Sequence, residues 1–222
     1  NMAKCYGIGV GPGDPDLLTL KALKLLRVCP VVAAPDNATA FDIARGVYED
    51  IESKEYMPLK LVMTKDVEKR EKAYRQAVKE IENKLDEGKD VACLTLGDVS
   101  VYSTFMYMYK LLTEDGYEAE IVPGITSFCA SAARMGISLG EREESIHIIA
   151  SSYDLEKELD YSGTKIYMKA GKQISKLREL LQKKEKKAYA ISNCGMPEEK
   201  VYESLDELGD DASYYSLIIV KD

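Results

Sequence analysis

The chain has 222 residues, of which 45% are hydrophobic and 31% are charged, and this is the composition of a globular protein long enough for one or two domains. Its formal net charge of −8 argues against a nucleic-acid partner, because such proteins usually carry a basic face or stripe. No apolar run approaches the roughly 20 residues that a membrane-spanning helix needs, so no membrane partner is expected.

The chain begins NMAKCYGIGVG, with no basic segment ahead of a long apolar stretch, which predicts no signal peptide and a cytoplasmic protein. The five cysteines form no C-x-x-C pair and are widely spaced: Cys5, Cys29, Cys93, Cys129 and Cys194. This spacing argues against disulfides and zinc and predicts small buried side chains. His147, the only histidine, is expected to be a half-buried strand residue with a satisfied partner, so no metal site is predicted.

Short apolar or β-branched runs alternate with longer segments of helical spacing. The expected strands span residues 5–10, 31–34, 91–96, 119–122, 146–150, 165–168, 188–192 and 216–220. Between residues 70 and 85, Tyr74, Ala77 and Ile81 recur at three- and four-residue steps, which predicts a helix that Gly88 closes. This alternation predicts an α/β protein with largely parallel strand pairing.

A proline–glycine turn, Pro123-Gly124, follows the expected strand 119–122 and precedes an expected helix over 125–135. Such a turn at the end of a strand-rich half is a natural domain boundary. The sequence therefore predicts an amino-terminal α/β domain over residues 1–123 and a carboxy-terminal α/β domain over residues 124–222, both with mostly parallel sheets.

Four segments interrupt the regular strands and helices. The first is G-I-G-V-G-P-G-D-P, residues 7–15, a glycine-rich turn that leaves the first strand. Glycines there allow a close approach of backbone or ligand. The turn is not a clean G-x-G-x-x-G, because Pro12 interrupts it and Asp14 stands where the third glycine belongs. A tight structural turn is therefore as well supported as a ligand site.

The second segment is L-T-L-G-D-V-S-V-Y-S-T-F, residues 94–105, in which an apolar strand runs into Gly97-Asp98 and then into hydroxyl-bearing residues. The carboxyl end of a strand in an α/β sheet is the usual place for a ligand. Asp98 either accepts hydrogen bonds from a ligand amine or hydroxyl, or caps the following helix. We favour the ligand role.

The third segment is V-P-G-I-T-S-F, residues 122–128, where Thr126 and Ser127 bring hydroxyls to the start of a helix. A helix cap and a ligand contact explain these hydroxyls equally well. The fourth segment, N-C-G-M-P over residues 193–197, breaks the chain directly after a strand. A serine nucleophile is not indicated, since the chain has no G-x-S-x-G elbow.

The order and spacing of these four segments resemble the tetrapyrrole methylases, the family that methylates uroporphyrinogen and precorrin rings. The matching pieces are GVGPGDPDLLTLKALKLL at 9–26, TLGDVSVYSTF at 95–105, VPGITSF at 122–128 and SNCGMPEEKVYESL at 192–205. The resemblance covers essentially the whole chain. Within the family, the last two pieces and the Y-S-T-F variant are most similar to the precorrin-2 and cobalt-factor II C20-methyltransferases.

This resemblance implies a homodimer of two-domain α/β chains that binds S-adenosylmethionine in the cleft between the domains and releases S-adenosyl-L-homocysteine. It implies methyl transfer to C20 of an anionic tetrapyrrole, precorrin-2 or cobalt-factor II, in cobalamin biosynthesis. Carried over position by position, the implied cofactor-binding residues are Pro12, Leu96, Gly97, Asp98, Val101, Thr126, Ser127, Met168 and Gly195.

In-line methyl transfer requires alignment of the two reactants and exclusion of water, and a dedicated general base is not obligatory. The candidates for contacting the ring or relaying a proton stand beside the implied cofactor loop: Tyr102, Ser103 and Thr104. The candidates for pairing with the substrate carboxylates are Lys60, Lys65, Arg134, Lys169 and Lys172.

Two positions depart from the family pattern. Val99 stands where the family has a proline after the aspartate, and Ala34-Pro35 replaces an acidic residue of some uroporphyrinogen methylases. The second departure counts against the uroporphyrinogen reaction. The alternatives that remain are a methylase of the same fold acting at C11 or C17, diphthine synthesis on a protein histidine, and a nucleotide-binding α/β module without methyl chemistry.

Overall fold

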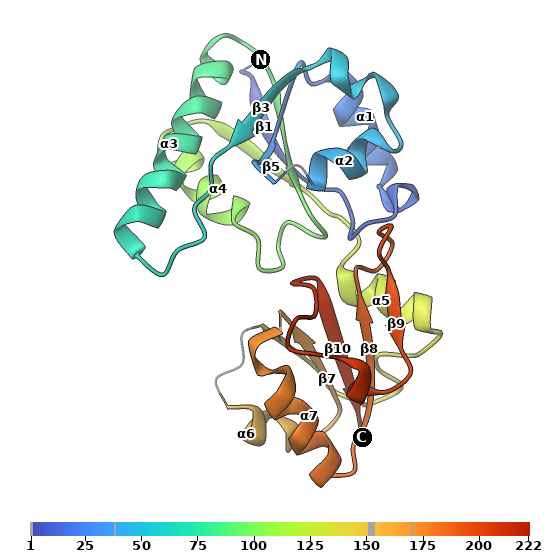
Figure 1. Ribbon diagram of the computed structural model, residues 1–222. Coiled ribbons are helices and arrows are strands. Elements are labelled where there is room, and N and C mark those ends of the chain that lie inside the picture. The colour runs from blue at the N-terminus through green and yellow to red at the C-terminus, as the bar shows by residue number, and fades with distance from the viewer. Residues whose placement is uncertain (1, 38, 151–153, 170) are drawn as a thin grey trace. The chain divides into compact units, whose positions relative to one another are not determined.

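The computed structural model describes residues 2–37, 39–150, 154–169 and 171–222. It consists of two compact units, Asn1–Thr126 and Ser127–Asp222 (Figure 1). The sequence places the boundary between Pro123 and Gly124, whereas the units divide between Thr126 and Ser127. Residues 124–126 therefore belong to the first unit, since Gly124 packs closely against Gly9 and Gly97.

The first unit is built on a five-stranded sheet in the order β3-β2-β4-β1-β5, in which every neighbouring pair is parallel. The strands are β1 (Lys4–Gly9), β2 (Val31–Pro35), β3 (Glu55–Leu59), β4 (Val91–Thr95) and β5 (Glu118–Val122). The helices are α1 (Leu20–Val28), α2 (Thr39–Arg45), α3 (Val67–Asp86) and α4 (Phe105–Glu114). The predicted parallel α/β pairing is confirmed for this unit.

The two faces of this sheet are covered by different helices. Leu94 packs in a core with residues of α1 and α2, whereas its neighbour Cys93 packs in a second core with residues of α3 and α4, because successive strand residues point to opposite faces. Figure 1 shows α1 and α2 on one side of the sheet and α3 and α4 on the other. The crossovers that leave the neighbouring strands β1 and β4 run in opposite directions, and the carboxyl ends of two such strands are the usual place for a ligand in an α/β sheet.

The long helix of this unit follows its predicted pattern. Ala77, Ile81 and Leu85 on α3 are buried on one face, and Gly88 adopts φ +78° just past the helix end. That left-handed conformation is free of strain only for glycine. The prediction that Gly88 closes the helix is therefore confirmed.

The second unit has a five-stranded sheet in the order β6-β7-β10-β8-β9. Its strands are β6 (Ile146–Ala150), β7 (Thr164–Met168), β8 (Lys187–Ser192), β9 (Lys200–Tyr202) and β10 (Ser216–Lys221), and its helices are α5 (Ser127–Met135), α6 (Leu155–Leu159) and α7 (Ile174–Lys183). Residues of α6 and α7 share a core with Tyr167, Ala190 and Ile218 of the sheet.

The expectation of mostly parallel pairing has to be corrected for this second sheet. Only β6 and β7 pair in parallel, while β10 runs against β7 and β8, and β9 runs against β8. The physical reason is the connection: β8 reaches β9 through residues 193–199, a link too short for the crossover that a parallel pair needs. The chain then returns through β10, which inserts between β7 and β8.

The predicted burial of the cysteines holds for three of them. Cys5, Cys29 and Cys93 are buried in the first unit, whereas Cys129 on α5 is exposed and Cys194 after β8 is half-buried, and all are free thiols. Burial raises the pKa of the Cys93 thiol to about 12, so that side chain acts as a small apolar group.

A buried carboxyl group on α3 is unusual for this unit. Glu82 is 8% exposed, and its Oε1 atom has no hydrogen-bond partner among the described residues. Burial, followed by a hydrogen bond with Asp115, raises the pKa of Glu82 from an ordinary value of 4.5 to about 7. Because the folded-state pKa lies above the unfolded one, ionisation of Glu82 favours the unfolded chain as the pH rises from about 4.5.

Glu82→Gln is therefore expected to raise the free energy of unfolding by about 1–2 kcal/mol at pH 8 and to change it little at pH 4. The amide of the new glutamine donates to Asp115 as the protonated acid does, and it carries no charge to desolvate. Urea unfolding at both pH values measures the difference. Glu71→Gln, on the exposed face of α3, is the control; an equal gain in both variants at pH 8 would contradict the burial argument.

Candidate functional site

Two of the four sequence segments are joined by backbone hydrogen bonds at the carboxyl edge of the first sheet. Val10 N–H donates to the Thr95 carbonyl at 2.9 Å, which extends the pairing of β1 and β4 beyond the strands. Gly97 N–H then donates to the Gly11 carbonyl at 2.8 Å, and Gly11 N–H donates back to the Gly97 carbonyl at 3.2 Å. The turns over residues 7–15 and 94–105 therefore lie side by side at this edge.

The third segment packs against these two turns through glycines. A Cβ atom on Gly9 would lie 2.6 Å from the Gly97 carbonyl oxygen and 2.9 Å from Gly124 Cα, and a Cβ atom on Gly124 would lie 2.8 Å from the Gly9 carbonyl oxygen. Real Cβ atoms essentially never approach other atoms within 3.0 Å. Only glycine fits at both positions, and the backbones of three segments meet where side chains are absent.

Asp98 connects the second and third segments. Its Oδ1 atom accepts a hydrogen bond from Gly124 N–H at 2.8 Å, and its Oδ2 atom accepts bonds from Ser100 N–H at 2.9 Å and from the Ser100 hydroxyl. Burial acts to raise the pKa of Asp98, but the bonds from Ser100 and Gly124 outweigh burial and hold the pKa below its ordinary value. The side chain is therefore a carboxylate that fixes two loops.

This arrangement differs from the helix-cap interpretation of Asp98. Helix α4 begins at Phe105, and Thr104 occupies its N-cap position, so Asp98 lies too far along the chain to cap it. Asp98 instead closes a local turn, in which Val101 N–H donates to the Asp98 carbonyl at 3.3 Å. An aspartate whose side chain accepts a hydrogen bond from the backbone two residues further on is common in turns. Asp98, two residues before Ser100, was therefore the available sequence signal for this turn.

Seven predicted cofactor contacts fall on these joined segments. Pro12 is buried in the first turn and Gly97 is buried in the second, where Leu96, Asp98 and Val101 are half-buried. Thr126 is half-buried at the end of the third segment, and Ser127 begins α5 in the second unit. The predicted contacts of the first unit are thus brought together at one edge of its sheet.

The side chains at the three predicted catalytic positions differ in their exposure to solvent. Tyr102 has φ +50° and a side chain that is 53% exposed; a non-glycine residue in this region stores about 1–2 kcal/mol of strain. Ser103 is buried, and its hydroxyl oxygen accepts a bond from Phe105 N–H at 3.1 Å. Thr104 is half-buried at the start of α4. Exposure favours Tyr102 over Ser103 for contact with a substrate.

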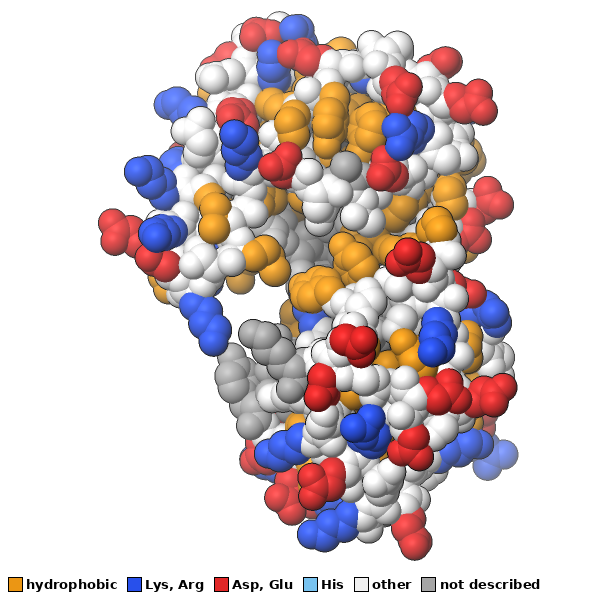
Figure 2. Space-filling model, in the orientation of Figure 1, with side chains coloured by type: hydrophobic (Ala, Val, Ile, Leu, Met, Phe, Trp, Pro, Cys, Tyr) orange, Lys and Arg blue, Asp and Glu red, His pale blue; other side chains and the backbone are white. Residues whose placement is uncertain are grey.

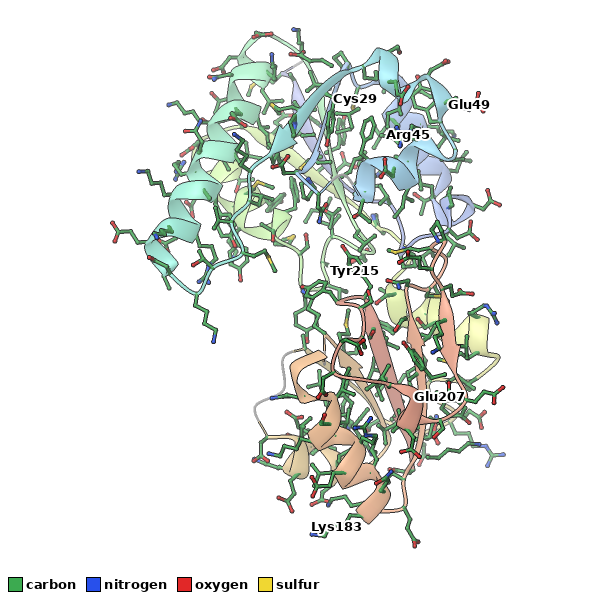
Figure 3. All side chains as sticks on the ribbon, in the orientation of Figure 1. Cys29, Arg45, Glu49, Lys183, Glu207 and Tyr215 are labelled. Carbon is green, nitrogen blue, oxygen red and sulfur yellow. The ribbon has the colours of Figure 1, made fainter. Side chains whose placement is uncertain are left out.

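The two remaining predicted contacts lie at one end of the second sheet. Met168 ends β7 and pairs with Leu217 at the start of β10. Beyond β8, Asn193 N–H donates to the Tyr215 carbonyl at 3.1 Å, and Gly195 follows in the same turn with φ +75°. Figure 3 shows Tyr215 at this end of the unit and Lys183 at the other. Met168 and Gly195 are thus brought to the same end.

The predicted carboxylate partners are scattered. Lys60 and Lys65 are exposed in the loop between β3 and α3. Arg134 Nε donates to Glu199 at 2.9 Å, and the Lys169 ammonium lies 5.6 Å from the centroid of the Tyr214 ring; the side chain of Lys172 lies outside the described residues. Figure 2 shows cationic and anionic side chains interspersed over the visible face of each unit.

The single histidine lies on a strand of the second unit. His147 lies half-buried on β6 with Nε2 2.9 Å from the Ser162 carbonyl oxygen, so the prediction of a strand histidine with a partner is confirmed. The described residues contain no cluster of three or more histidine, cysteine or acidic side chains suited to a metal ion. Within the described part of the chain, no helix has the length and apolar character needed to cross a bilayer.

Known proteins that resemble this chain belong to the family that the four sequence segments indicate. The family model of tetrapyrrole (corrin/porphyrin) methylases matches residues 4–209. The protein of Methanocaldococcus jannaschii named "Probable cobalt-precorrin-2 C(20)-methyltransferase" is 37% identical, over 98% of this chain and 96% of its own. The precorrin-2 C(20)-methyltransferase of a Sinorhizobium species is 26% identical, over 99% of this chain and 95% of its own.

A solved structure shares the fold. Uroporphyrin-III C-methyl transferase from Thermus thermophilus, complexed with S-adenosylhomocysteine, superimposes with a TM-score of 0.75 at 22% identity, over 99% of this chain and 98% of that one. The family model covers most of the chain, and the resemblance that the four segments indicate is confirmed. This chain belongs to the tetrapyrrole (corrin/porphyrin) methylases.

Proposed function

We propose that this protein transfers a methyl group from S-adenosylmethionine to C20 of precorrin-2 or cobalt-factor II in cobalamin biosynthesis. The observation that carries the proposal is the 37% identity, over 98% of this chain, to a protein named for that reaction on cobalt-precorrin-2. The relative named for the metal-free ring is 26% identical. The test therefore includes cobalt-precorrin-2 and precorrin-2, the rings that the relatives are named for, beside cobalt-factor II.

S-adenosylmethionine as the donor is supported by a protein of the same fold that was solved with S-adenosylhomocysteine. The carboxyl edge of the first sheet supports such a ligand at Gly97, where a Cβ atom would meet only the Ile125 carbonyl oxygen, at 3.9 Å, so that the backbone is accessible at the usual place for a ligand in an α/β sheet. The proposed contacts are Pro12, Leu96, Gly97, Asp98, Val101, Thr126 and Ser127, together with Met168 and Gly195. When bound, this cofactor supplies a methyl group activated on a sulfonium.

The residues of the chain then have two tasks, which are to orient the ring carbon and to keep water out. Of the three candidate positions, Tyr102 is best suited to contact the ring, since its side chain is exposed whereas Ser103 is buried. Lys60 and Lys65, exposed after β3 at the same carboxyl edge, are suited to pair with the ring's carboxylates. The expected assembly is a homodimer, which sedimentation of the purified protein tests.

The experiment is mass spectrometry of precorrin-2, cobalt-precorrin-2 and cobalt-factor II, each incubated with the protein and S-adenosylmethionine. We expect one added methyl group on at least one ring, mapped to C20 by NMR. Uroporphyrinogen III is the matched substrate control, and it is expected to remain unmodified. Methylation at another carbon, or of uroporphyrinogen III alone, would refute the C20 assignment while keeping the family.

A further inference from the structure

The turn after β8 is held at both ends by side chains. Asn193 and Gly195 both adopt left-handed backbone angles, with φ +53° and +75°, a region that glycine and asparagine adopt more readily than other residues. The Asn193 amide holds one end, since its Nδ2 donates to the Glu198 carbonyl at 3.3 Å and its Oδ1 accepts from the Ser213 hydroxyl at 2.7 Å.

The other end is held by one carboxylate. Glu199 Oε1 accepts a hydrogen bond from Gly195 N–H at 3.0 Å, and Glu199 Oε2 accepts one from Arg134 Nε on α5 at 2.9 Å. The bond from Gly195 N–H, together with the nearby Arg134 guanidinium, overcomes partial burial and holds the pKa of Glu199 below its ordinary value. The group is thus a carboxylate whose two oxygens connect the turn to a helix.

A second contact secures the same pair of elements. The Cys194 thiol, within the turn, lies close enough to Ser131 and Glu199 for both side chains to influence its pKa, and Ser131 is buried on α5. Ser131 and Arg134 lie three residues apart, so they occupy the same face of the helix. The turn therefore rests on one face of α5, and Glu199 is the side chain that reaches both the helix and the Gly195 amide.

We propose that Glu199 is a positioning residue for the methyl-transfer site, in that it fixes the backbone of Gly195 against α5. The inference rests on the proposed function, in which Gly195 contacts the cofactor. Removal of the carboxylate changes no residue between Asn193 and Gly195, but it frees the turn to sample other conformations. The consequence is weaker cofactor binding, because ordering the turn then has to accompany binding.

The test compares three full-length variants with the wild type: Glu199→Ala, Glu199→Gln and Glu198→Ala. Glu198 is the neighbouring exposed glutamate and serves as the matched control. Calorimetry with S-adenosylhomocysteine is expected to give about a tenfold higher Kd for Glu199→Ala, a smaller increase for Glu199→Gln, whose amide oxygen can still accept from Gly195, and no change for Glu198→Ala.

Two further readouts separate positioning from simple loss of stability. Hydrogen exchange of the Gly195 amide is expected to accelerate in Glu199→Ala and not in Glu198→Ala. The KM for S-adenosylmethionine is expected to rise about tenfold, with kcat at saturation changed less than about twofold. Wild-type affinity or wild-type exchange in Glu199→Ala overturns the inference. A wild-type protein that binds no S-adenosylhomocysteine refutes the proposed function itself, and the inference with it.

Discussion

Replacing Gly124 with alanine is expected to abolish binding of S-adenosylhomocysteine and to lower the melting temperature by roughly 10 °C, equivalent to about 3 kcal/mol. A Cβ atom there would lie 2.8 Å from the Gly9 carbonyl oxygen and still closer to the Gly97 carbonyl oxygen. Both neighbours are backbone atoms of strand ends and turns, so neither can move aside without breaking the bonds between Gly11 and Gly97. In the Gly124→Ala variant the three segments therefore have to move apart to make room for the added methyl group.

Gly171→Ala is the control, because a Cβ atom at Gly171 meets nothing within 4 Å. Thermal unfolding and calorimetry on both variants make the comparison. A Gly124→Ala protein that melts and binds like Gly171→Ala would show that the third segment does not approach the first two closely enough to form one site.

The sequence missed two strands, both at sheet edges, although it predicted the other two edge strands, β5 and β6. The expected strand over 31–34 is β2 almost to the residue, whereas β3 (Glu55–Leu59) and β9 (Lys200–Tyr202) were not predicted. Both are edge strands, and β3 is largely exposed and contains Pro58. These two strands lack the continuous apolar run that marks a buried strand, and an edge position tolerates proline and charge.

The direction of the strands in the second unit could not be predicted from the local sequence pattern. The strands β7, β8 and β10 have the same apolar character whichever way their neighbours run, since period and burial are local properties. What sets β10 against β7 and β8 is where the chain returns after β9. That is a long-range fact, which no window of sequence contains.

In the candidate site, too, the sequence predicted the residues that have a local signal and missed one that depends on the fold. The glycines and Asp98 were found because each interrupts a regular pattern at a strand end. Glu199 was not found, because it stands beside Glu198 and nothing local distinguishes the two glutamates. Only the fold brings α5 to one of them and places its carboxylate on the Gly195 amide.

The partners of Asp98 likewise follow from the fold, and they make its removal the second large expected effect. Asp98→Ala is expected to lower the free energy of unfolding at pH 7 by about 3 kcal/mol, since hydrogen bonds to a charged group contribute about 1.5–3 kcal/mol each. The variant leaves Gly124 N–H and the Ser100 hydroxyl without the carboxylate they bind. Binding of S-adenosylhomocysteine is expected to fall with the loss of the 122–128 loop position.

Asp98→Asn separates the charge of this side chain from its shape. The pKa of Asp98 is lowered in the folded protein, so its ionised form stabilises the fold above the unfolded pKa of about 3.9, and that stabilisation is lost as the pH falls through the lower folded pKa. Urea unfolding should therefore show a deficit for Asp98→Asn that is constant from pH 5 to 7 and shrinks below pH 4. Asp36→Asn, at an exposed position, should show no such deficit. No deficit at any pH would mean that Asp98 holds Gly124 by shape alone, and a deficit that persists unchanged to pH 2 would mean that it does not arise from the charge of the carboxylate.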